Sequence, residues 1–414
     1  MSFERARAIA DAVLLEGYVL YPYRALSTKN RYRWNFGVVA PELPGTSEPS
    51  WLASECWLEA GAELELSGRL RFLHVEERAV QVADGEGFFD TECLEIDGKP
   101  YLSWQEGALE EVDFELSGGG QQAEEFRFSV PASANEERLF DSRGRLLGRV
   151  LRTRAALEGV VQVALEPVEV LGRLLTRLSL VVRNATSLER VEERAETLPR
   201  SMISTHILLW LRRRTFLSPL ETAAFPAVRE PTAPNQTLYP VLVGSPGSRD
   251  LLLCSPIILE EYPAIAPESP GHFFDSGEID ELLTLRTLTL TEREKLLARA
   301  TDARAAEVLD RVESLSEAGF SALHGKVREY SGRGRFAAGD RVRLRPGKRR
   351  TDAQDLLFAG CAATIQAVRC DAEGRDVLAL TIDADPAAEL HRWYGRFHYY
   401  YADEVEPLEE ASSP

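Results

Sequence analysis

A strict alternation of side chains from Leu174 to Arg183 (LLTRLSLVVR) most constrains what this chain can fold into. Every second position, counted from Leu174, carries an apolar or β-branched side chain, and the period of two is that of a strand with one face turned inward. Similar short runs occur at 62–73, 110–116, 124–130 and 159–170, separated by glycine-rich or charged turns. The pattern predicts an antiparallel, sandwich-like β-rich domain over residues 1–195, after a short helix at 8–15.

The rest of the chain changes character, and its 414 residues favour two or three domains. For residues 196–320 we expect an apolar helical piece at 201–211, an ordered proline-rich loop at 239–286, and helices that start at Thr291 and at Asp302. Residues 335–410 carry short alternating runs around a Gly339-Asp340 turn that resemble a small Src-homology-like β-barrel of the KOW kind. The expected fold class is therefore mainly β with a smaller α portion.

Composition and charge exclude several classes of protein. The formal net charge of −18 argues against a whole-molecule polyanion binder, although residues 326–350 hold ten basic and two acidic side chains. Five cysteines without a CxxC pair predict reduced thiols and a cytoplasmic protein. We expect no signal peptide, because Glu16 interrupts the first apolar run. The sequence has no long apolar span and no glycine-rich phosphate loop, so we predict no membrane insertion and no cofactor.

An aromatic and basic segment lies near the N-terminus. Arg31 and Arg33 alternate with Tyr32, Trp34 and Phe36. This order predicts a strand with an aromatic core face and a basic outer face, and the alternative interpretation is a stacking platform for single-stranded nucleic acid.

An acidic cluster within 268–281 is the first candidate site. Its density of carboxylates is typical of a solvated or helix-capping surface, and the alternatives are a partner-docking patch or a divalent metal or acid–base site. Asp275, Glu278 and Asp280 are the candidate metal ligands, although their spacing fits no calcium loop. The partner-binding candidates in this cluster are Glu268, Asp275, Glu278, Asp280 and Glu281.

A second candidate is the segment GSRDLLLCSPI, which places Arg249, Asp250 and Ser255 close in sequence. A serine nucleophile needs a positioned base, and the segment has no GxSxG turn. Cys254 lies in an apolar run and is expected to be a buried small side chain. We therefore assign no catalytic residue here.

The basic start of the predicted barrel, RVRLRPGKRR, is the third candidate. Arg343, Arg345, Arg349 and Arg350 could contact an acidic protein or nucleic acid phosphates, while the common structural interpretation is a solvated strand face. An acidic protein is the favoured partner among the two, and nucleic acid is unlikely for so acidic a chain.

Three blocks carry a family resemblance: ADAVLLEGYVLYPYRALSTKNRYRWNFGVV, the segment from Pro240 to Arg286, and the ending HRWYGRFHYYYADEVEPL. Together they resemble an uncharacterised bacterial family whose genes lie beside those of uptake nickel–iron hydrogenases. The resemblance implies a role in assembly or maturation of a hydrogenase, and it supplies no catalytic residues.

Our leading hypothesis is a non-enzymatic cytosolic accessory factor whose partner is a hydrogenase subunit or maturation factor. The first alternative is a metal-dependent hydrolase or ligand-binding enzyme that uses the acidic cluster 268–281 with Ser255 or His272. The second alternative is nucleic-acid binding through the basic start of the barrel.

Overall fold

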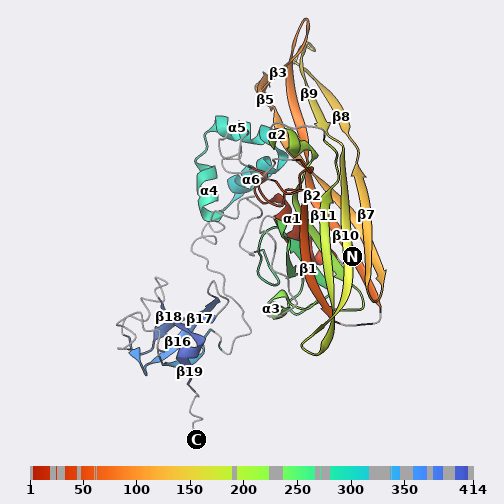
Figure 1. The fold of residues 1–414 in the computed structure, drawn as a ribbon. Helices are drawn as coiled ribbons and strands as arrows, with labels where there is room; N and C mark the ends of the chain where they lie inside the picture. The colour runs from red at the N-terminus through yellow and green to blue at the C-terminus, as the bar shows by residue number, and fades with distance from the viewer. Residues whose placement is uncertain are drawn as a thin grey trace. The chain divides into compact units, whose positions relative to one another are not determined.

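The structure is a computed structural model that divides the chain into two compact units, Met1–His324 and Gly325–Pro414. Figure 1 shows both, and each is described separately below. The described residues are 3–18, 25, 33–43, 48–59, 61, 63–188, 194–222, 236–265, 271, 280–316, 336, 338–345, 358–370, 376–385 and 397–408.

The first unit contains two antiparallel sheets and a small hairpin. One sheet has the order β1 (Trp51–Glu59), β11 (Arg173–Asn184), β10 (Leu157–Val170) and β7 (Gln122–Val130). The other has the order β13 (Tyr239–Leu242), β14 (Leu251–Ser255), β12 (Met202–Leu211), β2 (Leu64–Asp84), β9 (Leu146–Arg154) and β8 (Ser133–Phe140), and both β3 (Gly87–Thr91) and β6 (Trp104–Gly118) also pair with β2. The hairpin joins β4 (Cys93–Ile96) to β5 (Lys99–Leu102).

The two sheets face each other across the main core, as the alternation in the sequence predicted. Leu178, Leu180 and Val182 of β11 are buried in one cluster with Leu70 of β2 and Ile207 of β12. The prediction of a mainly β fold with a smaller α portion is therefore confirmed.

Two glycines make room for aromatic rings in this core. Gly68 of β2 lies opposite Phe114 of β6, and a Cβ on Gly68 would lie 2.0 Å from the Phe114 ring. Gly159 of β10 lies opposite Phe128 of β7 in the same way, with 2.1 Å to the ring. Each ring occupies the space that a side chain on the glycine would fill. A shift in strand register would remove this fit, so core packing helps to fix the register of both strand pairs.

The first unit also contains six helices among its described residues. They are α1 (Arg7–Leu15), α2 (Arg194–Thr197), α3 (Pro219–Thr222), α4 (Asp280–Leu288), α5 (Glu292–Thr301) and α6 (Ala303–Ser314), with 3-10 turns at Phe3–Ala6 and Leu198–Arg200. Of these, α1 and α6 pack on the outer face of the larger sheet. Val308 and Leu309 of α6 pack with Leu73 and Val75 of β2 in a second core. Figure 1 shows α4, α5 and α6 on one side of the sheets. Among the described helices, none combines the length and apolar character needed to cross a bilayer.

Both predicted helix starts are confirmed. Thr291 caps α5 through a capping box with Glu294, in which the Glu294 N–H donates to Thr291 Oγ1 at 3.3 Å and the Thr291 N–H donates to Glu294 Oε2 at 2.9 Å. Asp302 caps α6, because its Oδ1 accepts the Arg304 N–H at 2.8 Å.

Two other expectations from the sequence are wrong. Residues 201–211 were expected to be helical, but Met202–Leu211 forms the strand β12 between β2 and β14. The proline-rich stretch 239–286 was expected to be a loop, but Tyr239–Leu242 and Leu251–Ser255 are paired strands. Pro240 is tolerated because β13 is the last strand of the sheet order and has one hydrogen-bonding side free.

Arg33 is also placed differently from its prediction. It is only 5% exposed, and its guanidinium lies 3.5 Å from the ring centre of Trp104 and 4.4 Å from that of Trp34. The expected basic outer face therefore fails at this residue, whereas Trp34 is buried as predicted. Burial lowers the pKa of Arg33 to about 9. Arg31, Tyr32 and the stretch around them lie outside the described residues.

The second unit contains a five-stranded antiparallel sheet with the order β18 (His398–Tyr401), β17 (Asp376–Ile382), β16 (Ala362–Cys370), β15 (Arg341–Leu344) and β19 (Val405–Pro407), and a 3-10 turn at Ala402–Glu404. Val342 and Leu344 are buried in its core with Ile365. No pairing of β18 with β19 occurs among the described residues, so the predicted barrel is supported only as far as a small antiparallel sheet.

A buried cation joins α1 to the larger sheet. Arg71 of β2 is 2% exposed, and its guanidinium lies 2.5 Å from Asp11 of α1 and 2.8 Å from Glu111 of β6. His206 of β12 lies next to it, with Nε2 3.5 Å from an Arg71 nitrogen and Nδ1 2.8 Å from the Ser204 carbonyl. Burial, followed by the charge of Arg71, lowers the pKa of His206 to about 3.

This environment predicts an acid-sensitive fold. In the unfolded chain His206 takes up a proton near its ordinary pKa of about 6.5, but in the folded chain it stays neutral until about pH 3. Stability is therefore lost as the pH falls through 6.5, and we expect His206 to cost about 2 kcal/mol between pH 7 and pH 5. Urea unfolding of the full chain at both pH values measures it. His206→Gln should flatten this dependence, and an unchanged dependence in that variant would contradict the assignment.

Candidate functional site

The sequence-predicted candidates do not converge in the first unit. Arg249 forms an exposed ion pair with Glu221 at 2.6 Å, and Asp250 forms one with Arg5 at 2.5 Å. Ser255 is fully buried at the far end of β14, where its Oγ accepts the Ile257 N–H at 3.2 Å. Each of the three therefore has a structural role, and β14 separates the first two from the third.

Cys254 is buried as predicted. Burial raises the pKa of its thiol to about 12, so the thiol stays protonated. It behaves as a small apolar side chain in the core between the sheets.

The acidic cluster falls mostly outside the described residues. Glu268, Asp275 and Glu278 lie there, and Asp280 and Glu281 open α4 but their side chains are not described. In the part of the chain that is described, no three histidine, cysteine, aspartate or glutamate side chains come together as metal ligands. The metal and partner-docking hypotheses for this cluster stay predictions.

In the second unit, Arg343 and Arg345 lie on the exposed face of β15 or just after it, as the alternation predicted. Arg345 pairs with Glu406 at 2.7 Å, and Arg343 donates to the Gly360 carbonyl at 3.1 Å. Arg349 and Arg350 lie outside the described residues. Some of the basic charge is therefore already balanced by acids of the same sheet.

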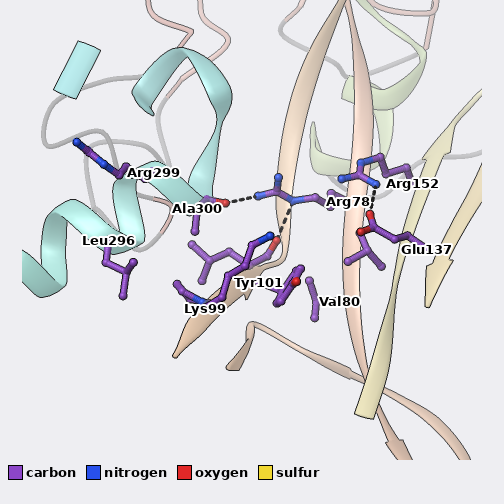
Figure 2. A pocket seen from close by; sticks show the side chains of 12 residues that line it. Arg78, Val80, Lys99, Tyr101, Glu137, Arg152, Leu296, Arg299 and Ala300 are labelled. Carbon is purple, nitrogen blue, oxygen red and sulfur yellow. Dashed lines mark hydrogen bonds and ion pairs between the residues drawn. The ribbon is translucent and has the colours of Figure 1, made fainter. Parts of the chain in front are cut away.

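The described residues instead form a cation-rich pocket of about 360 Å³ that the sequence did not reveal. We call it the Arg78 pocket. Its walls come from β2, β5, β8, β9 and α5, and it is lined by Arg78, Val80, Lys99, Pro100, Tyr101, Leu102, Glu137, Val150, Arg152, Leu296, Arg299 and Ala300. Four of these side chains are basic and one is acidic. Figure 2 shows Arg78 between the helix and the sheet strands.

Arg78 holds the pocket walls together. Its Nη2 donates to the Ala300 and Thr301 carbonyls at 3.0 and 2.7 Å, and its Nε donates to the Leu102 carbonyl at 2.9 Å. Its Nη1 pairs with Glu106 of β6 at 2.5 Å. The last carbonyls of a helix have no partner within the helix and attract cations, so one guanidinium fixes the end of α5 on the sheet.

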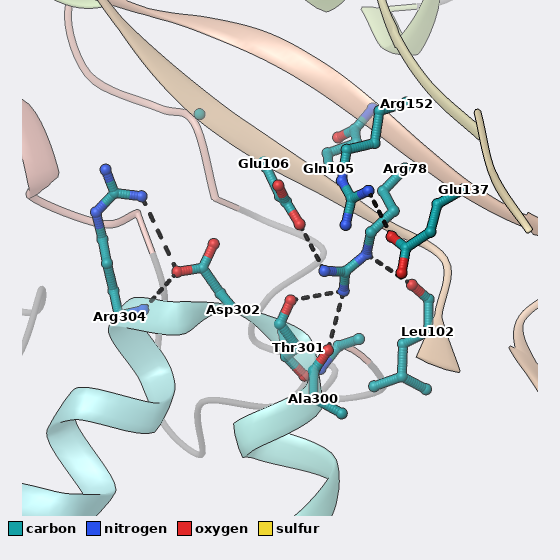
Figure 3. Close-up of polar contacts among 12 residues, drawn as sticks. Arg78, Leu102, Gln105, Glu106, Glu137, Arg152, Ala300, Thr301, Asp302 and Arg304 are labelled. Carbon is teal, nitrogen blue, oxygen red and sulfur yellow. Dashed lines mark hydrogen bonds and ion pairs between the residues drawn. The ribbon is translucent and has the colours of Figure 1, made fainter. Parts of the chain in front are cut away.

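A second polar pocket of about 360 Å³ shares Arg78 and Arg152 with the first. There the Tyr18 hydroxyl donates to Asp302 Oδ2 and accepts the Gly107 N–H, both at 2.8 Å. Figure 3 shows Glu106 directed at Arg78 and Asp302 beside Arg304. Burial raises the pKa of Glu106, which Arg78 opposes, and burial together with the Asp302 charge raises that of Tyr18.

These contacts give the region the properties of a binding site. Arg78, Arg152 and Arg299 are held in ion pairs, and Lys99 lies over the ring of Tyr101. The accessible apolar surface of the lining is at Leu296 and Tyr101. Small-molecule sites commonly combine an apolar lining with a few fixed charges. The arrangement can hold an anionic group against an apolar surface.

Comparisons with known proteins do not assign this site. The chain matches no protein-family model and no curated protein sequence. The resemblance to the hydrogenase-associated family therefore stays a prediction.

Removal of the Arg78 guanidinium should release α5. Arg78→Met leaves Glu106 and three carbonyl groups without their donor, so we expect a loss of about 3 kcal/mol in the free energy of unfolding. Hydrogen exchange should rise first at Glu292–Thr301. Arg293→Met is the matched control, because Arg293 is an α5 arginine in an exposed pair with Glu95 at 2.9 Å and should cost less than about 1 kcal/mol. Equal losses in both variants would argue against the role of Arg78.

Removal of the Tyr18 hydroxyl tests the second anchor. Tyr18→Phe leaves an Asp302 oxygen and the Gly107 N–H buried without this partner, and we expect a cost of about 2 kcal/mol by urea unfolding. Tyr101→Phe is the control, because the Tyr101 hydroxyl has no hydrogen bond among the described residues and its loss should be nearly neutral. The hypothesis fails if the two variants unfold at the same urea concentration.

Proposed function

We propose that the chain is a non-enzymatic accessory factor that acts by binding a protein partner, and that the Arg78 pocket is one of its contact sites. The observation that carries the proposal is the lining of this pocket, where cations lie beside the partly exposed Leu296 and Tyr101 in a chain of net charge −18. A local reversal of charge sign favours a partner whose contacting group is acidic.

The proposed partner is a subunit or a maturation factor of a nickel–iron hydrogenase, and the proposed location is the cytoplasm. This part of the proposal is supported by the sequence resemblance, which spans nearly the whole chain. The pocket supports the mode of action, which is binding, and the resemblance supports the identity of the partner.

Lys99 is the residue whose charge is best suited to a test. It is exposed at the start of β5, and its ammonium lies 4.9 Å from the ring centre of Tyr101. Among the described residues no carboxylate pairs with it. A substitution there changes the charge of the pocket without breaking a described ion pair.

The test is affinity capture of the tagged full chain from a hydrogen-oxidising bacterial host, with quantitative mass spectrometry of the captured proteins. We expect wild-type protein to enrich a hydrogenase subunit or maturation factor, and Lys99→Glu to reduce this enrichment about tenfold, because an attractive contact becomes repulsive. Arg143→Glu, an equal change of charge at an exposed turn, should leave it unchanged.

Two results would count against the proposal. Absence of every hydrogenase protein from the wild-type capture would remove the proposed partner. Full retention of such a protein by Lys99→Glu would exclude the Arg78 pocket as its contact site.

A further inference from the structure

The charges around the Arg78 pocket are not equally available to a ligand. Arg78 is engaged by Glu106 and by three backbone carbonyls. Arg299 pairs with Asp310 and Glu313 of α6, both at 2.7 Å, and Figure 2 shows its side chain directed away from Arg78. Two of the four cations are therefore committed to the fold.

The remaining two cations differ from each other. Arg152 has one partner, Glu137, whose carboxylate lies 3.2 Å from its Nη1, and the other N–H groups of Arg152 have no acceptor among the described residues. Lys99 has only the face of the Tyr101 ring. Because Glu137 balances Arg152, the pocket has one uncompensated positive charge, which belongs to Lys99.

The apolar part of the lining lies beside these groups. Val80, Leu102 and Val150 are buried behind the pocket surface and offer a ligand almost no accessible area, whereas Leu296 of α5 is 37% exposed and Tyr101 of β5 is partly exposed. The volume of about 360 Å³ is near the lower limit of roughly 300 Å³ for small-molecule sites. The space suits one side chain with its backbone groups rather than a long segment.

We propose that the Arg78 pocket binds a single carboxylate attached to an apolar group of about the size of a leucine side chain. The carboxylate pairs with Lys99, with the unengaged N–H groups of Arg152 as further donors, and the apolar group lies against Leu296 and Tyr101. One uncompensated charge matches a monoanion and is too little for a phosphate dianion. This inference rests on the proposed binding function and specifies the ligand that this function needs.

Two sources supply this chemistry, namely the C-terminal residue of a partner polypeptide and a free small carboxylic acid. Both present a carboxylate next to an apolar group, so the pocket contacts are the same. In a polypeptide, the residues before the C-terminal one add contacts outside the pocket, whereas a free acid makes no such contacts.

The test is calorimetric titration of the full chain at low salt with N-acetyl-leucine, N-acetyl-leucinamide and inorganic phosphate. We expect N-acetyl-leucine to bind about tenfold more tightly than the neutral amide. Lys99→Gln should weaken binding of the acid about fivefold and Arg152→Gln about twofold, with no effect on the amide. Leu296→Gln should weaken both ligands, and Arg143→Gln should weaken neither.

A peptide ending in leucine, compared with its C-terminally amidated form, separates the two sources. Binding of the free-acid peptide at least tenfold tighter than N-acetyl-leucine identifies a polypeptide C-terminus, and equal affinities identify a free acid. Equal binding of acid and amide, tighter binding of phosphate, or no binding of the acid by folded wild-type protein would overturn the inference.

The capture experiment and the titration together distinguish failure of this inference from failure of the proposed function. Capture of a hydrogenase protein that depends on Lys99, without binding of N-acetyl-leucine, defeats only the ligand assignment. Binding of the acid, without any hydrogenase protein in the capture, defeats only the proposed partner.

Discussion

The contact on which the first unit depends most is the guanidinium of Arg78 against the C-terminal end of α5. A helix of ten residues has little stability of its own in water, so α5 needs contacts with the sheet to hold its position. The apolar face of α5 supplies some of these contacts, and Arg78 donates hydrogen bonds to two carbonyls at the end of the helix. The same side chain binds Glu106 of β6 and the Leu102 carbonyl of β5. One residue of β2 thus fixes α5, β5 and β6 relative to one another, and α5 and β5 are walls of the pocket.

The connection between α5 and α6 adds a second constraint that is coupled to the first. Asp302 caps α6 through one carboxylate oxygen and accepts the Tyr18 hydroxyl through the other. Tyr18 in turn accepts the N–H of Gly107, the residue next to Glu106. A cap that is also a buried hydrogen-bond partner holds the helix by its end as well as by its apolar face. The pocket is therefore formed by rigid elements, which is what a binding site with few available charges requires.

The sequence predicted individual strands and helix starts better than it predicted which residues of different elements lie together. The strand that holds Leu178, Leu180 and Val182 was recognisable because a strand with one solvated face alternates between apolar and polar side chains. The segment MISTHILLWL at 202–211 does not alternate, because β12 is buried on both faces. In sequence, such a strand resembles an apolar helix segment. Arg33 was predicted to be exposed, but the rings of Trp34 and Trp104 cover it, and Trp104 lies far from it in the sequence. The pocket was invisible because Arg78, Lys99, Arg152 and Arg299 come from four elements, and no local spacing records that they converge.

The overall charge of the chain bears on which ligand this pocket can select. A net charge of −18 repels anions at long range, and the repulsion grows with the charge of the ligand. Polyanions are therefore disfavoured before they reach the pocket, whereas a monoanion meets a smaller barrier and gains from Lys99 at short range. An exposed ion pair alone contributes less than about 1 kcal/mol, so apolar contact with Leu296 and Tyr101 must add to the affinity. Lys99 thus selects for a single negative charge, and contact with Leu296 and Tyr101 adds affinity that an acid and its amide share.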